Sequence, residues 1–173
     1  MENSKFHELC KAFGKSQQDF GKHQSESHQL AVEMVKLLKE YYQIPPSQFS
    51  LFRIDAQNEI EIVPPELINA LTLGSDSLWQ FGIGLTLCTA PESLPQELIL
   101  IQILIRNDLN NKFFISYGDH NEEFEVEKGN DKTFYPFFDY LHSTVINTYN
   151  EKLHHFKGQS TKRKLGFEIK KSI

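Results

Sequence analysis

Cysteine is scarce in this sequence, and its scarcity excludes one class of protein. Cys10 and Cys88 are the only two cysteines among 173 residues. Small secreted domains that are held together by disulfides need several pairs. We therefore expect both side chains to be reduced thiols of a cytoplasmic protein.

Long apolar runs and targeting segments are also missing. The most apolar run, residues 97–106, is far shorter than the roughly 20 residues that cross a bilayer as a helix. The first residues, Met1 to Lys5, contain no basic segment followed by an apolar one. We expect no secretory signal and no contact with a membrane.

Motifs that carry a specific chemistry are incomplete. Gly82-Ile83-Gly84 lacks the third glycine and the following helix of a phosphate-binding loop. Glu168-Ile169-Lys170 resembles half of the E-x-K motif of restriction nucleases, but no aspartate on a neighbouring strand completes a metal site. No spacing couples a nucleophile to a base. We expect no catalytic residue, no metal ion and no cofactor.

What the sequence does contain is the composition of one ordinary globular domain. The hydrophobic fraction is 39% and the charged fraction 24%, as in soluble domains of this length. Fourteen phenylalanines against two methionines predict a core of rigid aromatic rings. Residues 97–106 are apolar on both faces and rich in isoleucine, which predicts a central strand covered on both sides, with a buried helix as the alternative.

The remaining patterns predict an α+β fold with an antiparallel sheet of five to six strands. A meander spans residues 77–128. A hairpin with one solvent-exposed face spans residues 49–63. Within residues 77–89, Gly82 and Gly84 fall on the same face, which predicts a shallow groove or a closely packed helix there.

Helices are predicted at both ends of the domain, which extends over residues 1–156. Apolar residues recur at helical spacing within residues 4–20 and again within residues 30–42. The polar residues 22–29 between them are either a hinge or a more solvent-exposed part of the helix. A final helix is predicted from about residue 134 to residue 156, and we expect all these helices to cover the sheet.

The charge is divided unevenly, although the whole chain has a net charge of −5. The segment 157–173 has six basic residues and one acidic residue, whereas the rest of the chain has 12 basic and 22 acidic residues. This basic C-terminal extension is a solubilising tail or edge strand, a contact for an acidic protein, or a nucleic-acid site. The residues of that nucleic-acid site would be Lys162, Arg163, Lys164, Lys170 and Lys171.

The last predicted helix holds more aromatic residues than one helical face can bury. Five rings lie within residues 134–140. Surplus rings mark a protein interface, or else they cap the end of the sheet. We expect the partner-binding residues to be Phe138 and Tyr140, together with the groove at Gly82 and Gly84.

Two further groups could carry chemistry. Asp139 and His142 share one face of the last helix, where they could hold a metal ion or act as an oriented base. Residues 119–123 form an acidic turn without the spacing of a calcium-binding loop. The simpler interpretation for both is a solvated surface.

These observations give three hypotheses for function. The first is a non-catalytic cytoplasmic protein that binds another macromolecule, as a small subunit, an adaptor, a chaperone-like module or a homodimer. The second is a nucleic-acid-associated protein, or a nuclease accessory, that uses residues 157–173. The third is a small metal-dependent hydrolase that uses Asp139, His142 and the turn at 119–123.

Overall fold

The structure, a computed structural model, describes residues 4–54, 60–63, 66–90, 96–108, 110, 112–118, 122–156 and 167–171. Helical elements lie at both ends of the domain and between the strands: α1 (Lys5–Tyr42), η1 (Pro46–Gln48), α2 (Leu67–Ala70), η2 (Asp131–Thr133) and α3 (Tyr135–Phe156). The strands are β1 (Phe49–Ile54), β2 (Ile60–Val63), β3 (Thr72–Leu73), β4 (Trp79–Cys88), β5 (Gln96–Asn107), β6 (Phe113–Tyr117), β7 (Phe124–Val126) and β8 (Phe167–Lys171).

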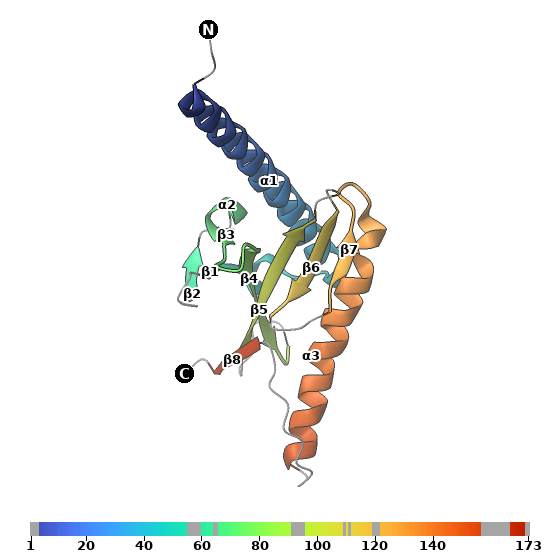
Figure 1. Ribbon diagram of the computed structural model, residues 1–173. Coiled ribbons are helices and arrows are strands. Elements are labelled where there is room, and N and C mark those ends of the chain that lie inside the picture. Colours follow the sequence, from blue (N-terminus) through green and yellow to red (C-terminus); the bar gives the residue numbers. More distant parts are fainter. Residues whose placement is uncertain are drawn as a thin grey trace.

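The strands form one antiparallel sheet in the order β2-β1-β4-β5-β6-β7 (Figure 1). β3 pairs with the start of β4, and β8 pairs with the first half of β5. β5 has β4 on one side over ten residue pairs, and β6 and β8 on the other side. The predicted α+β fold and the central position of this strand are therefore confirmed.

Both long helices pack on the same face of the sheet. The isoleucines of β5, at positions 99, 101, 103 and 105, belong to one buried cluster with Leu30 and Met34 of α1 and with Phe137 and Leu141 of α3. The opposite face of β5 carries Leu98 and Leu104, which are half-buried, and between them Leu100, which is buried. The two helices therefore cover one face of β5, and they meet each other where Tyr41 and Tyr42, at the end of α1, pack on α3. The expected cover on both sides of this strand is complete on that face and partial on the other, among the residues that the structure describes.

The groove predicted at the two β4 glycines is filled by a neighbouring strand. Phe52 of β1 is in register with Gly82, and Ser50 is in register with Gly84. A Cβ atom added to Gly82 would lie 2.9 Å from the Cβ of Phe52, and one added to Gly84 would meet the Phe52 ring and the Ser50 hydroxyl. The glycines thus make room for a side chain of the same sheet.

α1 is one continuous helix, so that residues 22–29 are a more solvent-exposed part of the helix, as the second of the two interpretations predicted, and not a hinge. The Ser4 hydroxyl caps its N-terminus by accepting a hydrogen bond from the His7 backbone N–H at 3.2 Å, and Gln43 ends it in the left-handed conformation. Gly14 and Gly21 lie inside the helix, where each costs about 1 kcal/mol relative to alanine. The first half of α1 projects beyond the sheet, and residues 4–25 are all exposed (Figure 1).

Candidate functional site

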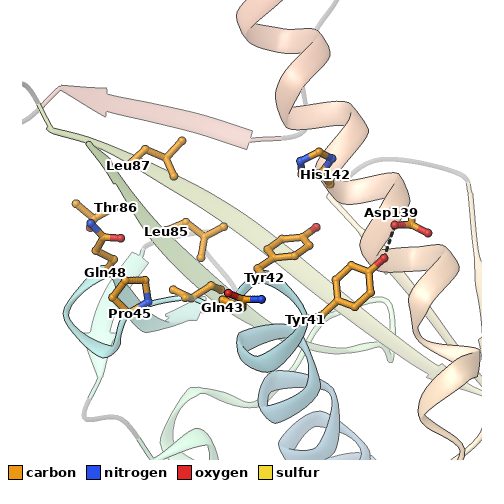
Figure 2. A pocket seen from close by; sticks show the side chains of 11 residues that line it. Tyr41, Tyr42, Gln43, Pro45, Gln48, Leu85, Thr86, Leu87, Asp139 and His142 are labelled. Atoms are coloured by element: carbon orange, nitrogen blue, oxygen red, sulfur yellow. Dashed lines mark hydrogen bonds between the residues drawn. The ribbon is translucent and has the colours of Figure 1, made fainter. Parts of the chain in front are cut away.

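A pocket of about 600 Å³ opens where the C-terminal end of α1 meets α3 and β4 (Figure 2). Tyr41 and Tyr42 enter it from α1, Asp139 and His142 from α3, and Leu85 and Leu87 from β4. This volume lies within the range of small-molecule sites, about 300–1,000 Å³. The helical spacing predicted that Asp139 and His142 share a face, and the structure places both at the rim of this pocket.

Both tyrosines of the pocket use their hydroxyls in hydrogen bonds to α3. The Tyr41 hydroxyl donates to Asp139 Oδ1 at 2.5 Å, and the Tyr42 hydroxyl donates to the Phe138 carbonyl at 2.6 Å. The hydrogen bond with Asp139 raises the pKa of Tyr41, and burial raises the pKa of Tyr42. Both phenols therefore stay protonated at neutral pH and act as donors.

The contacts of Asp139 and His142 decide whether these two residues can act together as an oriented base or hold a metal ion. Asp139 is held by a tyrosine rather than by His142, whose ring instead lies edge-on to Tyr42 with centroids 6.1 Å apart. Among the described residues, no group of three histidine, cysteine or acidic side chains is placed to hold a metal ion. The pocket can offer an apolar wall and a carboxylate, but Asp139 and His142 are not coupled as a catalytic pair.

The predicted partner-binding residues are mostly interior. Phe138 has 0% exposure, and Gly82 and Gly84 are buried. Tyr140 is half-buried, with its ring centroid 5.7 Å from Tyr117 and 5.2 Å from Phe124. Phe138 and the two glycines are therefore not available as an exposed surface, because the end of α1 packs on Phe138 and β1 packs on the glycines.

Tyr140 gives a prediction for alkaline pH. Burial, followed by a hydrogen bond with Glu122, raises its pKa from 10.0 to about 12. A tyrosine whose pKa is higher in the folded chain stabilises the fold fully below pH 10, and this contribution is lost as the pH rises through 12. We expect the free energy of unfolding to fall in this window, and Tyr140→Phe to make the fall shallower in urea titrations.

The control for this prediction is Tyr135→Phe, which removes a hydroxyl from an exposed ring of the same helix. An identical slope between pH 10 and 12 for Tyr140→Phe and the unchanged chain would contradict the assigned role of Tyr140.

The remaining predicted sites lie partly outside the described residues. Lys162, Arg163 and Lys164 of the nucleic-acid site are outside them, as are Asp119 and His120 of the acidic turn. Lys170 and Lys171 belong to β8, in register with Leu98 and Glu97 of β5. Glu123, also from the turn, accepts two hydrogen bonds from Arg106, at 2.8 and 2.6 Å.

A second candidate site lies on the projecting half of α1. Phe6, Leu9 and Phe13 are 73%, 68% and 66% exposed, and we call these three residues the N-terminal stripe. The sequence predicted that they share one helical face, but it placed that face on the sheet. The next large apolar residue on the same face of α1 is Phe20. Its ring centroid lies 6.0 Å from that of Trp79, at the start of β4.

A signal for this second site is present in the sequence as a seven-residue repeat. Residues 6, 13, 20, 34 and 41 are aromatic or methionine, and residues 9, 30 and 37 are leucine. These are the a and d positions of one heptad register, interrupted by polar residues at 16, 23 and 27. The N-terminal stripe therefore lies on the same face of α1 as Leu30 and Met34, which are buried against the sheet.

No protein-family model, no curated protein and no solved structure matches this chain. Among the described residues, no helix combines the length and apolar character needed to cross a membrane.

Proposed function

We propose that this protein acts by binding another macromolecule, and that the N-terminal stripe of α1 is its docking surface. The observation that carries the proposal is the exposure of Phe6, Leu9 and Phe13, each above 65%, next to one another on a single helical face. Neighbouring large apolar side chains that face solvent are typical of interaction sites.

The energetics support binding at this position. Burying one large apolar side chain fully is worth about 1.5–3 kcal/mol. The stripe stands on a helix that is fixed to the domain by Leu30, Ala31, Met34 and Leu38, all with 0% exposure. A partner would therefore meet a preformed surface, and less of the binding energy would be spent on ordering the chain.

The test is a triple variant, Phe6→Gln, Leu9→Gln and Phe13→Gln. Glutamine is a good helix former, so α1 should persist while its apolar face is lost. We expect the variant to lose the complexes that the unchanged chain forms, measured by light scattering on the purified protein and by affinity capture. The matched control replaces Lys11, Gln18 and Ser25, on the reverse face of the same exposed segment, by alanine.

The proposal requires the control to retain every complex that the triple variant loses. Equal assembly mass and equal capture for the unchanged chain and the triple variant would overturn it. Circular dichroism of each variant verifies that the helix content is preserved.

Nucleic-acid binding through residues 157–173 remains a prediction that follows from the uneven charge. Within the described residues this segment contributes only β8, which completes the edge of the sheet beside β5. That placement agrees equally with the simpler role of an edge strand protected by lysines.

A further inference from the structure

We infer that the macromolecule bound by the N-terminal stripe is a second copy of the same chain, with the two α1 helices antiparallel about a two-fold axis near residue 11. This inference rests on the proposed function, because it names the occupant of the same surface. Three features of α1 carry it: the length of its free segment, the order of its side chains and the position of its charges.

The free segment has the length that an antiparallel pair needs. Residues 4–25 are exposed, and Phe20 is the first large apolar residue that contacts the body of the domain, at Trp79. If Leu9 of each copy meets Phe13 of the other, residues 5–17 overlap, over about 18 Å of helix. Lys5 of each copy then lies level with Gln17 of the other, three residues before Phe20, and the two domains lie at opposite ends of the pair.

The side chains of the stripe complement one another in this register. Two-fold symmetry makes every contact occur twice, so that Leu9 and Phe13 form two central layers. Phe6 lies opposite the small Ser16 in the two outer layers, which leaves room for the ring. On one side of these apolar layers Ala12 of each copy faces Ala12 of the other, and on the opposite side Cys10 faces Cys10. No like charges therefore meet at the centre of the contact between the two helices, which we call the seam.

The charges favour the antiparallel orientation over the parallel one. In the antiparallel register, Lys5 of each copy lies beside Asp19 of the other, giving two pairs of opposite charge at the flanks of the seam. In a parallel pair Lys5 would instead lie beside Cys10, and no opposite charges would meet across the seam. A parallel pair would also bring the two domains together at Phe20, which already packs on Trp79.

The area of the contact predicts a reversible dimer. A helix pair of this length lies below the roughly 1,200 Å² that a stable interface buries. We therefore expect a monomer–dimer equilibrium with a dissociation constant of roughly micromolar size, rather than a permanent dimer.

The experiment uses the full chain with Cys88→Ser, so that Cys10 is the only thiol. Sedimentation velocity between low and high micromolar concentration follows the mass, and a short bismaleimide reports whether two Cys10 side chains lie close together. The matched control carries Cys10→Ser, Cys88→Ser and Lys11→Cys, which moves the thiol to the outer face of the helix. We expect the mass to rise to that of a dimer, with cross-linking through Cys10 and none through position 11.

The outcomes separate this inference from the proposed function. A monomer at every concentration, with no Cys10 cross-link, overturns the self-pairing even if the stripe still captures a different protein. A dimer without the Cys10 cross-link overturns the antiparallel arrangement. If the triple glutamine variant also retains every complex, the proposed function fails as well.

Discussion

Replacing Phe138 by alanine is expected to lower the free energy of unfolding by about 3–5 kcal/mol. Its side chain has 0% exposure and lies in an aromatic cluster, with ring centroids 5.5 Å from Tyr41, 6.2 Å from Phe134 and 6.2 Å from Phe137. The substitution would leave a cavity where the end of α1 packs on α3. Urea unfolding at low protein concentration measures the change.

The matched control for Phe138→Ala is Phe13→Ala, the same substitution at an exposed position. Phe13 is 66% exposed, so its removal should change the free energy of unfolding of the monomer by about 0.5 kcal/mol or less. Comparable losses for the two variants would contradict the assignment of Phe138 to the core and of Phe13 to the surface.

Replacing Gly84 by valine is the second change with a large expected effect, a loss of about 3 kcal/mol, at the upper end of the cost of overpacking. A Cβ atom at this position would meet the Phe52 ring and the Ser50 hydroxyl, and Phe52 is only 4% exposed. Neither strand can move away easily, because β1 and β4 are paired over residues 49–52 and 82–85. Thermal and urea unfolding measure the loss.

A double variant identifies the cause of the Gly84→Val loss. In a Phe52→Ala background the ring is gone, so adding Gly84→Val should cost much less than it does alone. Gly14→Ala controls for the loss of a glycine alone, because nothing lies within 4 Å of the Cβ atom that it adds. This variant should not destabilise the protein. Equal costs of Gly84→Val with and without Phe52 would exclude the proposed contact.

The central strands and the final helix could be predicted because their signals are local. The isoleucines within residues 97–106 and the alternation from Trp79 onward define β5 and β4, and Pro136 lies in the first turn of α3. Each of these signals depends on residues a few positions apart, so the sequence alone is sufficient to detect it.

The errors concern contacts between distant parts of the chain. Phe52 fills the space at Gly82, but the register that brings them together joins residues 30 positions apart. Phe138 was expected at the surface because α3 alone cannot bury five rings, yet Tyr41 and Tyr42 of α1 cover it. The partner of Asp139 is likewise Tyr41, 98 positions away.

The sequence leaves open whether α1 is one helix or two. Gly14 and Gly21 are helix-weakening residues, and the polar residues 22–29 fit either a hinge or a solvent-exposed part of the helix. The cost of two glycines, about 2 kcal/mol, is spread over a helix of 38 residues whose second half is anchored by the core. The periodicity indicated that the apolar face continues, but it could not show that the sheet ends before the helix does.

Hydrogen exchange of α1 as a function of protein concentration tests the role of the N-terminal stripe most directly. We predict that amides of residues 5–17 exchange more slowly at high micromolar concentration than at low concentration, because pairing covers this segment. Amides of residues 30–42 should exchange slowly at both concentrations, because the core already protects them. Exchange of residues 5–17 that does not change with concentration, and does not change when a captured partner is present, would contradict a docking role for this half of α1.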